Sequence, residues 1–274
     1  MLIDIQYLNS TACEGDVQSP FYQIIMLKDH GNFSVDFTNY VCPNYSLIFL
    51  SPYQHFQFQF QDLDSRSIKK LEFHGDFYCI EYHKKEVGCN GLLFNNIYLS
   101  PFVTVTSALF EEIESIFDKI VLERAEDSAF SESVLKSYLQ LVLALCSKVK
   151  SPQLINSRVY HDELTVGLKF QKLLEAFFLI ERSVQFYAYE LALGLDSFSK
   201  KVKKELGKSP SQFIQDRVVL EAKKLLHLTY LSIKEIAAKL GFEDEFYFSR
   251  YFKKNVGISP SSFRERVGIS IVAK

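Results

Sequence analysis

Hydrophobic positions recur along the chain with two different periods, and the first covers residues 20–105. Apolar and polar residues alternate there over short runs, as in the segment 55–60 (HFQFQF), and turn-forming residues such as Pro43-Asn44 separate the runs. A period of two is typical of strands with one buried face. Many short strands with regular turns predict a small antiparallel barrel or jelly roll over residues 1–105.

From Ser107 onward the period changes to about 3.6 residues, which is typical of helices. Two amphipathic helices are expected over residues 107–149, with a polar break at Glu126–Ser128. The apolar stripe of the second helix contains Leu135, Tyr138, Leu139, Val142 and Leu143. After the helices, Pro152 and neighbouring polar residues interrupt both periods, so residues 151–160 are expected to be a linker. The helices themselves could cap the barrel.

The helical pattern resumes after the linker, and its clearest stretch is Ile233–Glu265. Gly241 separates two short amphipathic segments, because glycine takes the left-handed backbone of a helix end without strain. The second segment alternates apolar and basic positions, and Gly257 and Ser259-Pro260 mark its end and the next helix start. This arrangement predicts a helix-turn-helix, although an amphipathic helical hairpin can also be only a packed pair.

A second copy of the pattern, at residues 188–213, favours the helix-turn-helix interpretation. Ala188 matches Ala237, Phe198 matches Phe248, and Ser209-Pro210 matches Ser259-Pro260, with a slip of one residue near the turn. The helix expected between the copies, Ser211–Leu226, spans about 20–25 Å. That length can place two recognition helices in successive major grooves about 34 Å apart.

The predicted fold class is therefore α+β with two domains. Residues 1–150 form an antiparallel β-barrel or jelly roll followed by two helices, and residues 161–274 form an all-α domain with two helix-turn-helix motifs joined by a long helix. A length of 274 residues and an apolar share of 47% suit two such domains.

Charge divides between the two halves, although the whole chain carries only −2. Residues 1–150 contain 11 Lys and Arg against 19 Asp and Glu, whereas residues 151–274 contain 20 against 14. The resulting charges of −8 and +6 point to a polyanionic partner for the second half only. The chain start lacks a secretory signal pattern, no apolar run reaches the length of a membrane span, and the five cysteines show no metal-ligand spacing. We expect a cytoplasmic protein without membrane contact.

Two segments of the second half resemble the DNA-binding domain of the AraC/XylS family of bacterial transcription regulators. They are residues 241–264 (GFEDEFYFSRYFKKNVGISPSSFR) and 209–226 (SPSQFIQDRVVLEAKKLL), the latter similar to the family's connecting helix. The first copy departs from the family pattern, because Val202 replaces the usual phenylalanine and Lys200 the usual arginine. Lysine lacks the bidentate fork of arginine, which puts base reading by the first copy in doubt.

The resemblance implies a sequence-specific transcription regulator that binds promoter DNA, with an activator favoured over a repressor. It also implies a cupin-like sensor domain before the linker. In such proteins the helices that follow this domain pair two subunits, so Leu135, Tyr138, Leu139, Val142 and Leu143 are candidate dimerisation residues. A homodimer, RNA polymerase and a small-molecule effector are the further candidate partners.

Candidate DNA-binding residues lie on the polar faces of the two recognition helices. The first copy offers Asp196, Ser197, Ser199, Lys200, Lys203 and Lys204, and the second Glu245, Phe246, Tyr247, Ser249, Arg250, Lys253 and Lys254. Arg250 is the main candidate for base reading, because its fork matches guanine O6 and N7. Lys203, Lys204, Lys253 and Lys254 are expected to contact phosphates, which position a protein without specifying sequence.

The barrel offers little for catalysis. Metal-dependent cupins need paired histidines, whereas His55 has no histidine two residues away, and no nucleophile triad or glycine-rich phosphate loop can be assembled. We therefore expect no enzyme activity, catalytic residue, metal or cofactor. Tyr53, His55 and Gln57 are candidate polar groups in a ligand pocket, or they face solvent.

Two alternatives stay open. The barrel could be controlled by a partner protein and bind no small molecule, or the chain could be a cupin-type enzyme with a DNA-tethering domain. A purified chain that retains a metabolite would oppose the first alternative. The missing ligand spacing argues against the second.

Overall fold

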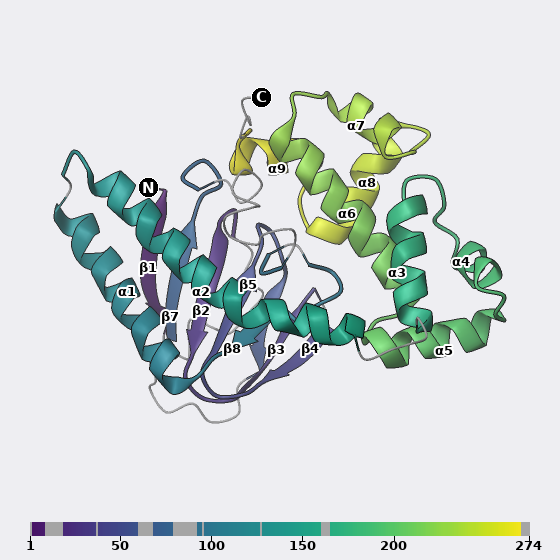
Figure 1. The fold of residues 1–274 in the computed structure, drawn as a ribbon. Helices are drawn as coiled ribbons and strands as arrows, with labels where there is room; N and C mark the ends of the chain where they lie inside the picture. The colour runs from purple at the N-terminus through teal and green to yellow at the C-terminus, as the bar shows by residue number, and fades with distance from the viewer. Residues whose placement is uncertain are drawn as a thin grey trace. The chain divides into compact units, whose positions relative to one another are not determined.

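The computed structural model describes residues 2–8, 19–36, 38–59, 68–78, 92–94, 96–126, 128–159 and 165–269 (Figure 1). The chain divides into two compact units, Met1–Leu154 and Ile155–Lys274. The first unit holds the strands and two long helices, and the described elements of the second are helices. No described helix is long and apolar enough to cross a membrane.

The strands of the first unit form two sheets. The larger sheet has the order β1-β7-β2-β5-β8 and the smaller one β4-β3-β6. Their bounds are β1 (Ile3–Leu8), β2 (Tyr22–Leu27), β3 (Gly31–Val35), β4 (Thr38–Cys42), β5 (Ser46–Leu50), β6 (Phe56–Gln59), β7 (Ile68–Phe73) and β8 (Phe102–Thr104). Every strand pairing in the described residues is antiparallel. The predicted antiparallel β domain is confirmed, but its described strands form two sheets and not one closed barrel.

The central strand β2 explains why two sheets form. Its residues are buried on both faces, so each face needs a cover. Ile24 and Met26 belong to a core shared with the helices that follow the sheets, whereas Ile25 and Leu27 belong to a core shared with Phe33 of the smaller sheet. The larger sheet is thus covered by helices on one face and by the smaller sheet on the other.

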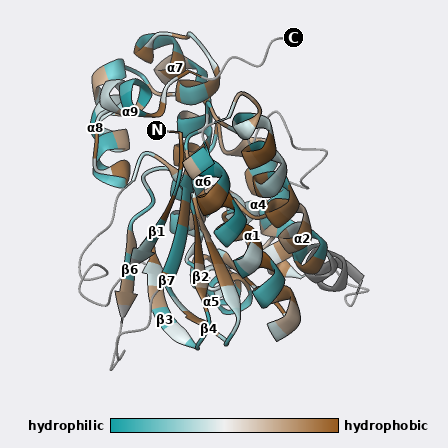
Figure 2. Cartoon of the chain, turned by 90° about the vertical axis from the view of Figure 1, so that its left-hand side faces the viewer, coloured by the Kyte–Doolittle hydropathy of each residue, from teal (hydrophilic) through white to brown (hydrophobic). Residues whose placement is uncertain are grey.

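The two helices of the first unit are α1 (Ser107–Glu126) and α2 (Ser131–Val159). In Figure 2 both alternate between hydrophobic and hydrophilic segments, as expected of helices that cover a core. The candidate dimerisation residues lie on the covering side of α2. Leu135, Leu139, Val142 and Leu143 are buried in this chain's own core, and Tyr138 packs against it. A partner subunit cannot reach the four buried side chains where they lie, because they cover the chain's own sheet, as in the interpretation that the helices cap the barrel. Pairing of two chains stays a prediction.

Helix α2 also continues to Val159, through residues 151–159 that were expected to interrupt the helix. Propagation of a helix gains one hydrogen bond for each residue added, whereas an interior proline removes one such bond and crowds the carbonyl four residues earlier, at a cost of about 3 kcal/mol. A long helix can nevertheless run through Pro152 and the polar residues beyond it.

The second unit contains seven helices within its described residues. They are α3 (Val166–Phe177), α4 (Val184–Glu190), α5 (Leu195–Leu206), α6 (Pro210–Leu228), α7 (Ile233–Lys239), α8 (Glu245–Val256) and α9 (Pro260–Val267). We call α3–α5 the first lobe and α7–α9 the second lobe. Aromatic rings fill both cores: Phe170 contacts Phe198 and Phe213 in the first, and Phe252 contacts Phe248 and Phe263 in the second. Helix α6 packs against both lobes.

Candidate nucleic-acid interface

The turn of the second lobe is fixed by local hydrogen bonds. Ser232 and Glu235 cap the start of α7 reciprocally, each side chain accepting a bond from the other's backbone N–H. At the end of α7, Gly241 takes a left-handed backbone with φ +72°, and the Phe242 N–H donates to the carbonyl oxygen of Ala237 at 2.9 Å. The expected role of Gly241 is confirmed.

Helix α8 presents one buried face and one exposed face. Its N-cap, Asp244, accepts a hydrogen bond from the Tyr247 N–H at 2.7 Å, and Gly257 ends the helix with φ +86°. Phe248, Phe252 and Val256 are buried. On the other face Phe246 is 68% exposed and Tyr247 49% exposed, and Arg250, Lys253 and Lys254 are exposed too.

The first lobe repeats this geometry with different residues. The Leu193 N–H donates to the Ala188 carbonyl oxygen at 2.9 Å, the same bond that Phe242 makes to Ala237. Ala192 has φ +52° and stands where the second lobe has Gly241. The loop that follows is one residue shorter, and the N-cap of α5 is Gly194, which makes no side-chain cap bond. The matched repeat and its single-residue slip thus appear in the structure.

The candidate residues of the first lobe lie on or beside the exposed face of α5. Phe198 and Val202 are buried, Asp196, Ser197, Lys200, Lys203 and Lys204 are exposed, and Ser199 is half-buried. In the second lobe Glu245 and Ser249 are half-buried beside the exposed residues of α8. The structure therefore places the candidate residues on two separate helix faces, that of α5 in the first lobe and that of α8 in the second.

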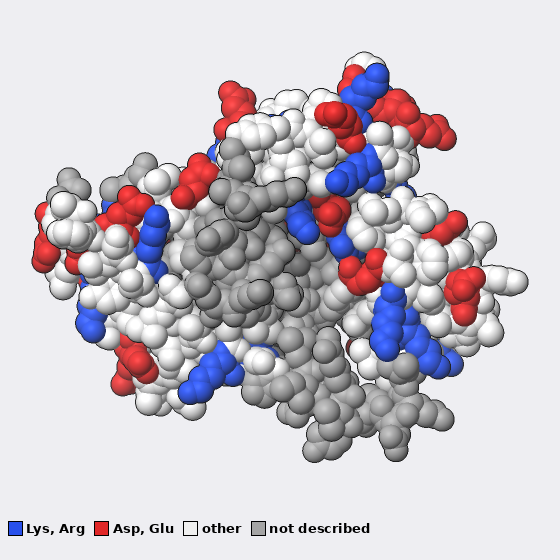
Figure 3. Space-filling model, turned by 45° about the horizontal axis from the view of Figure 1, so that its top comes forward, with Lys and Arg blue, Asp and Glu red and all other residues white. Residues whose placement is uncertain are grey.

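Basic side chains occupy the last turn of α5 and of α8, the second helix of each helix-turn-helix motif and hence its candidate recognition helix. Lys203 and Lys204 lie there in α5, and Lys253 and Lys254 in α8. Cations are favourable at this end of a helix because they oppose its dipole. On the face drawn in Figure 3, groups of Lys and Arg and groups of Asp and Glu both appear among uncharged residues.

Helices α5 and α8 each pass into the next helix through the same three residue types, glycine, serine and proline. Gly207 and Gly257 end α5 and α8 in the left-handed conformation. Two residues later Ser209 and Ser259 cap α6 and α9, with a proline in the first turn of each. The expected N-caps and prolines are confirmed.

Sequence reasoning missed Arg182 in the loop between α3 and α4. Its guanidinium donates a hydrogen bond to the Leu240 carbonyl oxygen at the end of α7. Burial lowers the pKa of Arg182 from its usual value. No local pattern marks this residue, because the contact joins positions 58 apart in the sequence.

The three candidate ligand residues of the first unit have different surroundings. Tyr53 is buried and has φ +56°, whereas His55 is half-buried and its backbone N–H donates to Asp36 Oδ1 at 3.0 Å. Gln57 is exposed on β6, where Phe56 and Phe58 on either side of it are buried. The alternation confirms the strand, and it places Gln57 on the face away from the core. A ligand role for the three side chains stays a prediction.

A buried polar cluster on the larger sheet was also missed. Glu72 accepts hydrogen bonds from Gln23 Nε2 at 2.7 Å, Lys70 Nζ at 3.0 Å and Gln6 Nε2 at 3.1 Å. The strand pairing places Gln23 opposite Glu72 on β2 and β7. Among the described residues, no three His, Cys, Asp or Glu side chains form a group that could hold a metal ion.

Comparison with known proteins agrees with this geometry. The family model described as a helix-turn-helix domain matches residues 187–266. The chain is 38% identical over 77 residues to the arabinose operon regulatory protein of Salmonella typhimurium, covering 28% of this chain and 27% of that protein. It is 30% identical over 175 residues to the HTH-type transcriptional regulator YfiF of Bacillus subtilis, covering 60% and 54%. The chain thus spans between about a quarter and about half of the length of these relatives.

Among solved structures, ToxT from Vibrio cholerae aligns with 97% of this chain and 99% of its own at 15% identity, with a TM-score of 0.41. The chain contains two helix-turn-helix motifs, one before and one after the long helix α6. Residues 187–266 thus form a helix-turn-helix domain of the kind found in AraC/XylS family regulators such as the arabinose operon regulatory protein.

Proposed function

We propose that this protein is a sequence-specific transcription regulator, and an activator, that binds double-stranded promoter DNA through its second unit. One observation carries the proposal. The helices α5 and α8 occupy matching positions in the two sequence repeats, and each presents an exposed polar and basic face. An α-helix of this kind fits the major groove and can reach the base edges there. The family membership of the domain supports the same partner.

The two reading faces differ in chemistry. Arg250 offers a fork for guanine, and the exposed rings of Phe246 and Tyr247 offer apolar contact to thymine methyl groups. Lys200 offers a single point charge at the matching place in the first lobe. The second lobe would therefore supply more of the sequence preference, and the first lobe more of the phosphate binding.

The first unit would control the second, by sensing a small molecule or by pairing two chains. Unit-to-unit control requires that a ligand bind two states of the protein with different affinity. A homodimer would use a surface other than the buried side of α2. We further propose a cytoplasmic protein, without enzyme activity, that contacts RNA polymerase at its promoters.

The proposal is tested by selecting bound duplexes from a random pool with the full chain, and measuring binding by fluorescence anisotropy over a range of salt concentrations. A convergent motif about two helical turns long is the expected result. Salt-dependent binding without a motif would reduce the protein to a nonspecific DNA binder. Absence of binding at low salt would remove the proposal.

Two substitutions separate base reading from phosphate binding. Arg250→Ala should lower the preference for the selected motif over scrambled DNA by about 5- to 150-fold, because one bidentate contact contributes about 1–3 kcal/mol of discrimination. Lys203→Ala should weaken binding to both duplexes alike and reduce the salt slope by about one unit. Equal effects of the two changes on both duplexes would contradict this division.

A further inference from the structure

The loop between α3 and α4 belongs to the first lobe but contacts the second. Arg182 lies in this loop, and its Nη2 donates a hydrogen bond to the carbonyl oxygen of Leu240. The guanidinium also lies over the ring of Phe242, with 3.9 Å between the guanidinium carbon and the ring centroid. A cation over an aromatic face is attracted by the ring quadrupole, and more strongly when it is partly withdrawn from water. We call the group formed by Leu179, Arg182, Leu240, Gly241 and Phe242 the interlobe contact.

Backbone atoms complete the interlobe contact. A Cβ added to Gly241 would lie 2.5 Å from the carbonyl oxygen of Leu179, which no side chain tolerates. The same glycine has φ +72°. Gly241 therefore serves two purposes, because it ends α7 and also lets the first lobe's backbone approach the turn directly.

Phe242 continues the interlobe contact into the recognition helix of the second lobe. Its ring centroid lies 5.7 Å from that of Tyr247 and 5.2 Å from those of Phe248 and Tyr251. Burial raises the pKa of Tyr251 to about 12, although the Arg182 cation opposes the rise, so the phenol stays neutral. One ring thus connects Arg182 to three residues of α8, of which Tyr247 is a candidate for contact with DNA.

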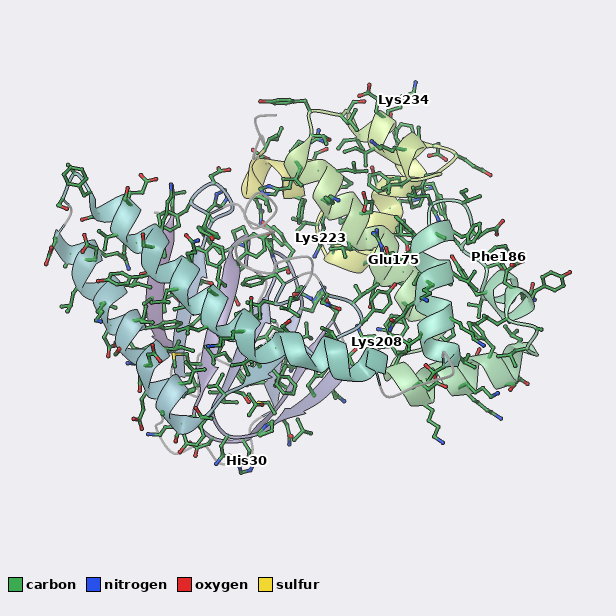
Figure 4. The ribbon with its side chains drawn as sticks, in the orientation of Figure 1. His30, Glu175, Phe186, Lys208, Lys223 and Lys234 are labelled. Carbon is green, nitrogen blue, oxygen red and sulfur yellow. The ribbon has the colours of Figure 1, made fainter. Side chains whose placement is uncertain are left out.

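On the side of the first lobe, the end of α3 is held by α6. Arg217 of α6 donates from Nε to the carboxylate of Glu175 at 2.9 and 3.0 Å, and its guanidinium carbon lies 3.8 Å from the ring centroid of Phe178. Glu175 is labelled on α3 in Figure 4. The loop that carries Arg182 therefore starts from a fixed point on α6.

These contacts give the two lobes a second connection besides α6. Helix α6 packs against both lobes, but contacts along one helix leave room for the lobes to turn about its axis, whereas a second joint away from that axis restricts the rotation. We propose that Arg182 is a positioning residue, and that the interlobe contact fixes the angle between the two recognition helices and thereby the spacing of the two DNA subsites that one chain accepts. This inference rests on the proposed function.

The test measures spacing dependence with the full chain on its selected motif. Two base pairs are inserted between the subsites, which rotates one subsite by about 70° because a turn contains about 10.5 base pairs. The wild-type chain should lose at least ~10-fold in affinity, since simultaneous engagement of both lobes is lost when the geometry does not match. Arg182→Ala should lose less than about threefold on the same insertion, because its lobes can rotate to follow the DNA.

Lys234→Ala is the matched control, because it removes one exposed positive charge from the second lobe at a place outside the interlobe contact (Figure 4). It should keep the wild-type loss on insertion. Should Arg182→Ala not fold, as judged by circular dichroism, Arg182→Lys replaces it, because an ammonium cannot lie flat on the Phe242 ring while bonding Leu240 as the guanidinium does. The expected loss for that variant lies between those of wild type and alanine.

Two results would overturn the inference, and they are distinguishable. If the wild-type chain selects a motif but Arg182→Ala or its lysine replacement keeps the full loss on insertion, the positioning role is wrong and the proposed function stands. If the wild-type chain selects no motif at all, the proposed function fails and the inference fails with it.

Discussion

The two lobes of the second unit build the same motif with unequal local support. The second lobe has a glycine at its left-handed turn, a reciprocal cap on α7 and an aspartate cap on α8. The first has Ala192 at the matching turn and the uncapped Gly194 before α5. Both lobes nevertheless close around a core of phenylalanine rings. The packed core therefore specifies this motif, whereas the turns and caps adjust its stability.

The largest expected effect is a destabilisation of the second lobe, which has the better local support. Gly241→Ala should destabilise the second lobe by about 3 kcal/mol, from the strain of a left-handed alanine and from overlap with the Leu179 carbonyl oxygen. Amide hydrogen exchange in peptides that cover α7 and α8 measures the loss. Gly207→Ala is the control, since a Cβ there meets nothing within 4 Å, and it should cost only about 1 kcal/mol. Equal losses at the two glycines would contradict the close approach.

A smaller effect is expected from a substitution that gives the first lobe the glycine turn of the second lobe. Ala192→Gly should stabilise the first lobe by about 0.5 kcal/mol, because relief of left-handed strain exceeds the extra backbone entropy of glycine. Hydrogen exchange in α4 and α5 reports the gain. Ala176→Gly, at an exposed position of α3, should have the opposite sign and cost about 1 kcal/mol. A loss at Ala192 would show that its backbone conformation is not strained.

The smallest expected effect concerns the missing cap. Gly194→Ser should stabilise α5 by a few tenths of a kcal/mol, because the hydroxyl oxygen can accept a bond from the first turn and the site is open. Gly194→Ala occupies similar space without that oxygen and should destabilise α5. The difference in urea midpoint between the two variants isolates the cap, and identical midpoints would dismiss it.

Much of the second unit could be predicted because its signals are local. Gly241, Gly257 and the two Ser-Pro pairs each mark a helix boundary within a few residues of chain, and the structure places boundaries there. The positive φ of Ala192 could not be predicted, since alanine has no preference for that conformation. Arg182 could not be predicted either, because its partner lies 58 positions away.

In the first unit, periodicity identified the elements but not their neighbours. The alternation at Phe56, Gln57 and Phe58 predicts which side chains are buried, and the structure agrees. An apolar stripe such as that of Leu139 and Val142 predicts that the side chains are buried, but not which element buries them. The cover proved to be the chain's own sheet. The split into two sheets depends on β2 being buried on both faces, which only the tertiary arrangement determines.

The passage from each recognition helix to the next helix has a consequence for how such a protein can change over time. Gly207 and Ser209, and likewise Gly257 and Ser259, complete an ending and a beginning within three residues. An insertion there would shift both helices at once, so the scaffold resists changes in length. The outward residues of α5 and α8 carry no such constraint. Under the proposed function, new operators can be acquired by point substitution on these faces, while the frame that holds them is inherited intact.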